Sequence, residues 1–597
     1  MYLSRIAIEN FRNFRNLDVA LAGSVVIVGE NRVGKSNLVY GLRLIFDPSL
    51  PDSARDLQLG DFWDGIEEYE RETRVKISVE IKDFEDDPDV LAVLTDFRIP
   101  GDPQTASLTY EFKARPGLLR APASEKDFEF VCYGGRDLTR RFGYDVRSRI
   151  TMDVLPALRD AEGDLAVWRR SPLRPLIDSA FATIDRDGLQ GVADQIAAAT
   201  GQLMDFQAVS DLEDDIAQSF RTMSGARQDV NPTLGFSATD ASKLHRQIKL
   251  LIDSGQRGIA EASLGSANLI FLTLKTMELH NLIAGDKRDH SLLAIEEPEA
   301  HLHPHLQRLV YRSLFQDASE PEDDGLDPPL SVIMTTHSPH IASVAPVRSL
   351  VLLREEEGET VGCSTASLDL SVSEADDLAR YLDITRAEML FARGIILVEG
   401  DAERFMVPRF AEELNIDLDG LGITVCSVAG TNFTPYAKFL ESLKIPFSII
   451  TDFDPDADRG QKRTVALARL LDGIRTEKYD DDYFDELLGT DEWERFDQSI
   501  GEFGVFTNAD TLEVDLFKGG FSAAIITGLR EGDFGKVRRD RIDTWEDDPR
   551  SMDREHLLSM IEDIGKGRFA QRLATRVGGI DVPGYIKRAI EHLTDRV

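Results

Sequence analysis

Acidic side chains follow two short apolar runs in the second half of the chain. Residues 395–398 and residues 447–450 each predict a buried strand. The carboxylates beyond these runs are Glu399, Glu403, Asp452 and Asp454. Because the carboxyl ends of neighbouring parallel strands meet at one edge of a sheet, we expect the four side chains to converge. Converging carboxylates repel one another unless a cation joins them, and oxygen ligands suit Mg²⁺ or Mn²⁺. The alternative is a pair of solvated acidic loops.

The paired acidic pattern resembles the Toprim domain, the metal-dependent phosphodiester fold of topoisomerases, primases and certain nucleases. The resemblance implies a Rossmann-like parallel sheet and DNA cleavage chemistry. Glu513 is a candidate for a further ligand, because a two-metal site needs more oxygens than four carboxylates supply. Lys566 lies between two glycines and has two interpretations. It either neutralises transition-state charge or protonates the leaving oxygen, or it is a surface lysine without a catalytic role.

A phosphate-binding loop follows a strand pattern near the amino terminus. Residues 24–28 predict a buried strand, and residues 29–36 read Gly-Glu-Asn-Arg-Val-Gly-Lys-Ser before a helical pattern. In this context, glycines let backbone N–H groups surround phosphates. Lys35 is predicted to reach the β- and γ-phosphates, and Ser36 is predicted to bind Mg²⁺. The predicted ATP-binding residues of the loop are Gly29, Asn31, Gly34, Lys35 and Ser36.

Two further buried strands end in polar residues that suit nucleotide hydrolysis. Residues 291–295 lead into Glu296, predicted to hold Mg²⁺, and Glu297, predicted to polarise the attacking water. Residues 331–336 lead into His337. A lone histidine is usually structural, but one at this strand end is well placed to sense the γ-phosphate. We therefore predict ATP hydrolysis, with Glu297 and His337 as catalytic residues.

Small residues, Ala-Ser-Leu-Gly-Ser-Ala from residue 262, open a predicted helix ahead of these strands. Ser263, Gly265 and the helix N-terminus are expected to meet a phosphate from a second subunit. The order of the four motifs resembles that of an ABC-type ATPase of the SMC and RecF kind over residues 1–355. The resemblance implies ATP sandwiched between two heads. The chain departs from that pattern in two places: Glu296 stands where many relatives carry Asp, and the signature lacks Ser-Gly-Gly-Gln.

Three histidines, His301, His303 and His305, directly follow the strand that ends at Glu296. Their spacing invites a zinc interpretation, but the segment has no cysteine partners. ABC-type ATPases place a subunit-contact loop at this point of the chain. We therefore expect a contact loop here rather than a metal site.

The composition is ordinary for a soluble globular protein, with 42% hydrophobic and 29% charged residues. No apolar run approaches the length of a membrane span, and the three cysteines are widely separated, so we expect a cytoplasmic protein. The net charge of −38 conflicts with the basic surface usual in nucleic-acid-binding proteins. Local basic stretches lie at residues 168–170, 536–539 and 566–568. They are candidate DNA contacts, although such stretches are more often solvated faces.

A chain of 597 residues is too long for a single core, and its patterns divide it into α/β domains. The predicted order is the amino-terminal part of an ABC ATPase with the phosphate loop (1–150), a helical insertion that is a possible dimerisation element (151–255), the second ATPase part (256–372), a helical linker (373–391), and a Toprim nuclease domain with carboxyl-terminal helices (392–597). Residues 6–21 predict a β-hairpin. The insertion has no long heptad run, so the coiled-coil arm of SMC proteins is missing.

An ABC-type ATPase without long coils, followed by a Toprim domain, is similar to the OLD (overcoming lysogenization defect) family of ATP-dependent nucleases. The segments that carry the resemblance are 397–403, 452–454, 511–513 and 566–570. The resemblance implies a site with two Mg²⁺ or Mn²⁺ ions, in which Lys566 assists. The implied ligands or base are Glu399, Glu403, Asp452, Asp454 and Glu513.

The same resemblance implies DNA as substrate, a dimer or higher oligomer, and a role in antiphage defence or DNA repair. Some members work with a helicase-like partner protein. The main alternative is a DNA-repair clamp or loader of the RecF type whose Toprim domain binds metal without cutting. A topoisomerase-like enzyme would need a tyrosine nucleophile, and the sequence shows no module that supplies one.

Overall fold

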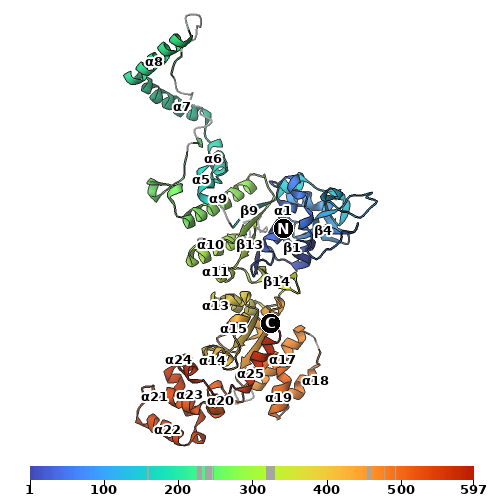
Figure 1. The fold of residues 1–597 in the computed structure, drawn as a ribbon, viewed down its shortest axis with the longest axis vertical. Helices are drawn as coiled ribbons and strands as arrows, with labels where there is room; N and C mark the ends of the chain where they lie inside the picture. Colours follow the sequence, from blue (N-terminus) through green and yellow to red (C-terminus); the bar gives the residue numbers. More distant parts are fainter. Residues whose placement is uncertain are drawn as a thin grey trace. The chain divides into compact units, whose positions relative to one another are not determined.

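The computed structural model of the chain has two compact units, Met1–Ala157 with His290–Val597, and Leu158–Asp289. Figure 1 shows the helices and strands in chain order by colour. The structure describes all residues except 158–159, 225–231, 235–244, 247, 301, 318–329, 383, 454–458, 476–477 and 491. Among the described helices, none combines the length and the apolar content that crossing a membrane requires.

An antiparallel sheet forms the amino-terminal part of the first unit. Its strands are β1 (Tyr2–Phe11), β2 (Phe14–Ala20), β4 (Arg74–Lys82), β5 (Arg98–Ile99), β6 (Asp102–Ala114), β7 (Phe128–Gly134) and β8 (Asp137–Arg141). They lie in the order β2-β1-β4-β6-β7-β8, and β5 pairs with β6. Buried residues alternate with partly buried ones along β4, because successive side chains of a strand point to opposite faces. The predicted hairpin is the antiparallel β1–β2 pair, so that prediction is confirmed.

A second, mostly parallel sheet carries the nucleotide motifs. Its strands are β3 (Val25–Gly29), β9 (Ile150–Leu155), β12 (His290–Glu296), β13 (Leu330–Thr336), β14 (Leu350–Glu356) and β15 (Glu359–Ser364). The order is β15-β14-β3-β13-β12-β9, and every neighbouring pair is parallel except β14–β15. The three predicted strands before Gly29, Glu296 and His337 are therefore confirmed. Because β13 lies between β3 and β12 and runs parallel to both, the ends of all three strands meet at one edge.

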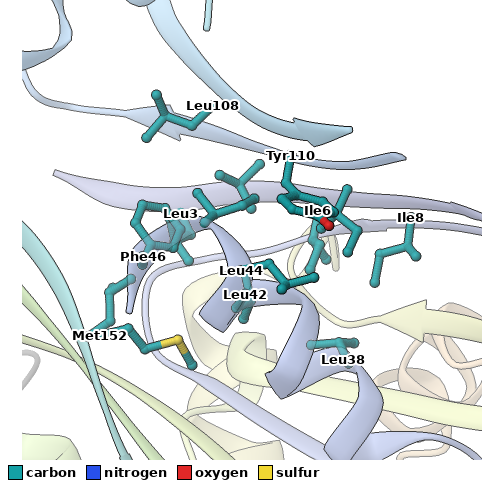
Figure 2. Packing of buried hydrophobic residues seen from close by; sticks show 14 of the residues in the cluster. Leu3, Ile6, Ile8, Leu38, Leu42, Leu44, Phe46, Leu108, Tyr110 and Met152 are labelled. Atoms are coloured by element: carbon teal, nitrogen blue, oxygen red, sulfur yellow. The ribbon is translucent and has the colours of Figure 1, made fainter. Parts of the chain in front are cut away.

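Helix α1 (Lys35–Phe46) packs against both of these sheets (Figure 2). Its residues Leu38, Leu42 and Phe46 share one buried cluster with Leu108 of β6 and Met152 of β9. Burying a large apolar side chain contributes about 1.5–3 kcal/mol, so this cluster fixes the helix firmly. Helix α1 begins at Lys35. The packing of α1 therefore also fixes the position of Lys35 at the end of the phosphate loop.

His290, the first residue of β12, gives the sheet a pH-dependent stability. The side chain is buried, and its Nε2 lies 2.9 Å from the Ser331 hydroxyl of β13. Burial lowers the pKa of His290 to about 3. Between pH 6.5 and pH 3 the unfolded chain binds a proton that the folded chain does not, so this contribution is lost as the pH falls.

We expect the wild-type chain to lose about 2 kcal/mol more stability than His290→Gln between pH 7 and pH 5, because only wild type carries the buried imidazole. Urea unfolding at both pH values measures the difference. His280→Gln, at an exposed position, is the control and should keep the wild-type pH dependence. A His290→Gln curve parallel to wild type would show that the buried imidazole does not contribute.

The second unit, Leu158–Asp289, is mainly helical. Its longer elements are α5 (Ala161–Ala166), α6 (Leu173–Ala182), α7 (Arg186–Gly201), α8 (Gln207–Ser224) and α9 (Leu264–Ala284). Helices α5 and α6 pack against α9. Residues 151–155, which lie in the range predicted to be helical, instead belong to β9 and pair with β12. The segment is a strand because it pairs with β12 along its whole length, and that contact forms only in the folded chain.

A third sheet, in the first unit, consists of four parallel strands. They are β16 (Gly394–Val398), β17 (Ile423–Ser427), β18 (Phe447–Thr451) and β19 (Val505–Thr507), in the order β17-β16-β18-β19. Helices α12 (Val372–Tyr381) and α13 (Ile384–Ala387) precede this sheet. The helices that matter for the site are α14 (Asp401–Glu413), α17 (Arg459–Arg475), α20 (Leu512–Leu516) and α24 (Lys566–Leu573). The two predicted strands at β16 and β18 are confirmed, and they are direct neighbours.

Candidate functional site

The loop between β3 and α1 has the backbone geometry of a phosphate-binding loop. Gly34 has a φ of 91°, and a Cβ atom there would lie 2.0 Å from Asn13 Nδ2, so glycine is required. Lys35 is buried and donates from Nζ to the carbonyl oxygens of Gly29 at 3.1 Å and Glu30 at 2.9 Å. Burial lowers the pKa of Lys35. The ammonium group therefore rests on loop carbonyls that phosphate oxygens would replace.

Two other predicted residues of the loop are exposed to solvent. Asn31 and Ser36 are exposed, and Ser36 lies in the first turn of α1. A cavity of about 1010 Å³ opens beside the loop and is lined in part by Asn31 and His337. The structure therefore has open space beside the first residues of the loop, Gly29 to Asn31.

The residues predicted to hydrolyse ATP lie at the ends of β12 and β13. Glu297 Oε1 is 3.8 Å from His337 Nε2, so the structure brings these two side chains together. Glu299, which sequence reasoning did not single out, accepts hydrogen bonds from the His337 amide at 2.6 Å and the Thr336 hydroxyl at 2.9 Å. Burial raises the pKa of Glu296 and lowers that of His337. The imidazole of His337 is thus neutral near pH 7. In this form it can accept a hydrogen bond and does not repel a cation.

The predicted signature residues lie at the start of α9, in the second unit. The Ser263 side chain is the N-cap of the helix and accepts a hydrogen bond from the Ser266 amide at 3.2 Å. Gly265 follows in the first turn. The predicted helix N-terminus is therefore present. Of the three histidines near residue 303, His301 lies outside the described residues, and the rings of His303 and His305 stack with centroids 6.0 Å apart.

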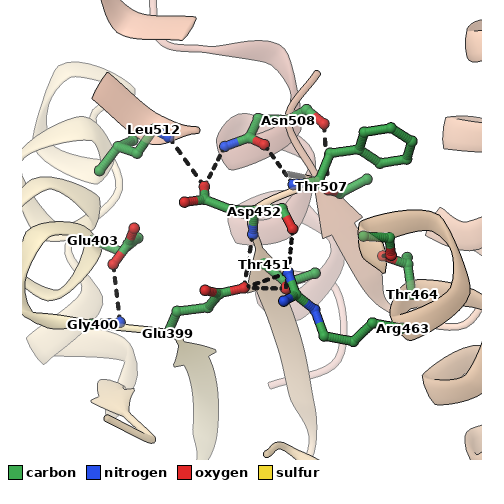
Figure 3. Close-up of polar contacts among 12 residues, drawn as sticks. Glu399, Gly400, Glu403, Thr451, Asp452, Arg463, Thr464, Thr507, Asn508 and Leu512 are labelled. Atoms are coloured by element: carbon green, nitrogen blue, oxygen red, sulfur yellow. Dashed lines mark hydrogen bonds and ion pairs between the residues drawn. The ribbon is translucent and has the colours of Figure 1, made fainter. Parts of the chain in front are cut away.

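The carboxylate of Glu399 lies directly beyond β16, where three donors converge on one of its oxygens (Figure 3). Oε1 accepts from the Thr451 hydroxyl, from the Asp452 amide at 3.0 Å and from Arg463 Nη2 at 2.9 Å. Thr451 is the last residue of β18, the neighbouring strand, and Asp452 follows it directly. The parallel pairing of β16 and β18 thus produces the predicted convergence of Glu399 and Asp452.

Two further carboxylates come from helices and are buried beside this strand edge. Glu403, in α14, is 7% exposed, and Glu513, in α20, is 6% exposed. Burial, together with the charges of Glu513 and Glu399, raises the pKa of Glu403 to about 7. Burial, with the charges of Glu403 and Glu399, also raises the pKa of Asp452 well above its usual range. The four carboxylates are therefore close enough for the charges of Glu399 and Glu513 to act on the buried Glu403 and Asp452.

This donor set fits a divalent cation, although the side chains do not form a finished ligand shell. Among the described residues, no three His, Cys, Asp or Glu side chains meet in a metal-binding cluster. Asp454 lies outside the described residues. Mutually repelling, buried carboxylates are the oxygen ligands that Mg²⁺ and Mn²⁺ prefer, and a cation between them would remove the repulsion. Lys566, the first residue of α24, extends the site, with Nζ 4.0 Å from Glu513 Oε1.

Comparisons with known proteins match both halves of the chain. Residues 24–343 match the family model described as "AAA domain, putative AbiEii toxin, Type IV TA system". Residues 390–454 match "Overcoming lysogenization defect protein-like, TOPRIM domain". A solved structure, the carboxyl-terminal region of the Burkholderia pseudomallei OLD protein, is 44% identical; the match covers 34% of this chain and 98% of that chain, with a TM-score of 0.29. The chain belongs to the OLD family.

Full-length relatives extend the match across both parts of this OLD-family chain. An "OLD nuclease" of Thermus scotoductus is 25% identical over 485 residues, which cover 77% of this chain and 84% of the relative. An "Endonuclease GajA" of Bacillus cereus is 22% identical, covering 87% of this chain and 89% of the relative. The fold class predicted from the sequence, an ABC-type ATPase fused to a Toprim domain, is therefore confirmed.

The sequence did not point to two residues that contact the carboxylates at the edge of the Toprim sheet. Asn508, the residue after β19, donates from Nδ2 to Asp452 Oδ1 and accepts from the Phe453 amide at 2.9 Å. The strand-end argument that found Glu399 applies to Asn508 as well and would have found it. Arg463 lies within α17, and no motif or spacing in the sequence marks it.

Proposed function

We propose that this OLD-family chain is an ATP-hydrolysing, divalent-metal-dependent DNA endonuclease. The observation that carries the proposal is the edge of the Toprim sheet, where buried or half-buried carboxylates from two strand ends and two helices gather. Structural ion pairs do not explain this gathering, because among the described residues the carboxylates outnumber the two cationic side chains paired with them, Arg463 and Lys566. The nuclease names of the full-length relatives support the same activity.

The proposed metal ligands are Glu399, Glu403, Asp452, Asp454 and Glu513. Two Mg²⁺ or Mn²⁺ ions, when bound there, would lower the pKa of a water nucleophile and neutralise charge on the phosphodiester. Asn508 and the Leu512 amide hold Asp452 Oδ1, the latter at 3.1 Å. The protein thus orients this carboxylate through groups that do not themselves bind a cation.

Lys566 is the proposed cationic assistant of the reaction. Its side chain is half exposed, so it can move away from Glu513 and reach a substrate. It would neutralise charge that develops on the phosphoryl oxygens or protonate the leaving oxygen. Glu399 is proposed to be a metal ligand or the base that positions the attacking water.

In the ATPase half, Gly29, Asn31, Gly34 and Lys35 are proposed to hold the ATP phosphates. Ser36 and Glu296 would hold the ATP-bound Mg²⁺, Glu297 would polarise the attacking water, and His337 would sense the γ-phosphate. A second copy of the chain would present Ser263 and Gly265 at its α9 N-terminus, which makes a dimer or higher oligomer part of the proposal.

The proposed division of the chain assigns 1–150 and 256–372 to the ATPase, 151–255 to the insertion, 373–391 to a linker and 392–597 to the nuclease. We place the protein in the cytoplasm, in antiphage defence or DNA repair, with DNA as its substrate. A helicase-like partner protein is a further part of this proposal. The basic residues of 536–539 and 566–568 are its candidate DNA contacts.

A cleavage assay on supercoiled and linear DNA, with Mg²⁺ or Mn²⁺ and with or without ATP, tests the proposal. We expect Asp452→Ala to lower cleavage at least about a hundredfold while ATP hydrolysis stays at the wild-type rate. Lys35→Ala should abolish ATP hydrolysis, and cleavage by this variant without ATP should persist. Asp482→Ala, at an exposed carboxylate of α18 (Asp481–Leu488), is the control and should cut normally.

Loss of both activities in folded Asp452→Ala would contradict the proposed separation of the two sites. ATP hydrolysis by the wild-type chain with no cleavage under either metal would instead favour a RecF-type clamp or loader.

A further inference from the structure

Arg463 links α17 to the ends of both central Toprim strands. Its Nη2 donates to Glu399 Oε1 at 2.9 Å, to the Thr451 hydroxyl at 3.1 Å and to the Asp452 carbonyl (Figure 3). The side chains of Arg463 and Glu399 are 25% and 19% exposed, so the pair is only partly screened by water. The position of the Arg463 guanidinium is therefore set by three acceptors at the carboxyl ends of β16 and β18.

The donors at Glu399 are distributed unequally between its two carboxylate oxygens. All three hydrogen bonds, from Thr451, Asp452 and Arg463, reach Oε1. Within the described part of the chain, Oε2 accepts no hydrogen bond. A carboxylate held through one oxygen has a fixed plane, so its second oxygen has a fixed direction.

We propose that Arg463 is a positioning residue of the nuclease site: it holds Oε1 of Glu399 so that Oε2 is directed at the bound cation or the attacking water. The inference rests on the proposed metal-dependent function. Arg463 does not touch the substrate or the cation; it acts through Glu399. A guanidinium suits the task because its planar donors are rigidly arranged, whereas a lysine ammonium is a flexible point charge.

The charge of Arg463 supports the same task. The carboxylates of Glu403 and Asp452 lie close to that of Glu399, so negative charge is concentrated at this edge of the sheet. The guanidinium of Arg463, 2.9 Å from Glu399 Oε1, offsets part of this charge while it holds the carboxylate in place. Arg463 thus supplies both an orientation and a charge, and two variants separate these contributions.

A test that does not depend on cleavage is Mn²⁺ binding to the full-length protein without nucleotide. The EPR signal of free Mn²⁺ measures this binding. We expect Arg463→Met, which removes both charge and hydrogen bonds, to weaken Mn²⁺ binding about 10- to 100-fold. Arg463→Lys keeps the charge and should recover part of the loss. The Mn²⁺ concentration for half-maximal cleavage should shift in the same order.

Arg469→Met is the matched control, because Arg469 lies on the same helix, α17, and instead pairs with Asp485 at 2.9 Å. It should bind Mn²⁺ as wild type does. ATP hydrolysis and the melting temperature report whether each variant is folded. A double variant tests the route of the effect: in a Glu399→Ala background, Arg463→Met should cause little further loss of Mn²⁺ affinity, because the carboxylate through which Arg463 acts is absent.

Two results would overturn the inference. The first is unchanged Mn²⁺ binding and cleavage in Arg463→Met; the second is tighter Mn²⁺ binding with faster cleavage, which would make Arg463 a competitor of the metal. Absence of Mn²⁺ binding in the wild-type chain would instead contradict the proposed function itself. The two failures are therefore distinguishable.

Discussion

Glu399→Gln is expected to lower the rate of DNA cleavage by about 10²- to 10⁴-fold, the usual loss when a catalytic acid–base group is removed. The glutamine is nearly isosteric, and its amide oxygen can still accept the hydrogen bonds that now reach Glu399 Oε1. The change therefore removes the negative charge while the strand ends keep their positions. Initial rates of nicking of supercoiled DNA at saturating Mn²⁺ measure the effect.

The control for this variant is Glu412→Gln, at an exposed carboxylate of the same helix that carries Glu403. It should cleave at the wild-type rate, and both variants should hydrolyse ATP normally. Cleavage by Glu399→Gln at the wild-type rate would remove Glu399 from the reaction and would leave the buried carboxylates Glu403 and Glu513 as the candidates to test next.

Glu297→Gln should reduce ATP hydrolysis by about 10²- to 10⁴-fold and leave ATP binding intact, because the carboxylate polarises water but does not hold the phosphates. The position supports this role, since Glu297 Oε1 lies 3.8 Å from His337 Nε2 at the ends of two strands. Phosphate release at saturating ATP measures hydrolysis, and equilibrium binding of a fluorescent ATP analogue measures affinity.

Glu67→Gln, at an exposed carboxylate of the first unit, is the control and should retain both properties. If Glu297→Gln lost nucleotide affinity together with hydrolysis, the residue would belong to the phosphate- or Mg²⁺-binding set rather than to water activation. A variant that hydrolysed ATP normally would leave Glu299, which anchors His337, as the carboxylate to examine.

The sequence determined the features that depend on local spacing. Residues 29–36 specify a phosphate loop because the left-handed Gly34 and the following helix start are properties of a short segment. The strand predictions at β3, β12, β16 and β18 were correct because buried parallel strands are continuous apolar runs. The carboxylates after these runs were found for the same reason, since polar residues at strand ends interrupt the apolar pattern.

Only the tertiary structure decided which strand ends are neighbours and what surrounds them. No local pattern shows that β9 joins the parallel sheet, because its six residues acquire a partner only when β12 packs beside them. The contact of Arg463 with Glu399 joins positions 64 residues apart, and that of Asn508 with Asp452 joins positions 56 residues apart. Sequence periodicity reports burial within one element, whereas the orientation of Glu399 depends on atoms from three elements that meet only in the folded chain.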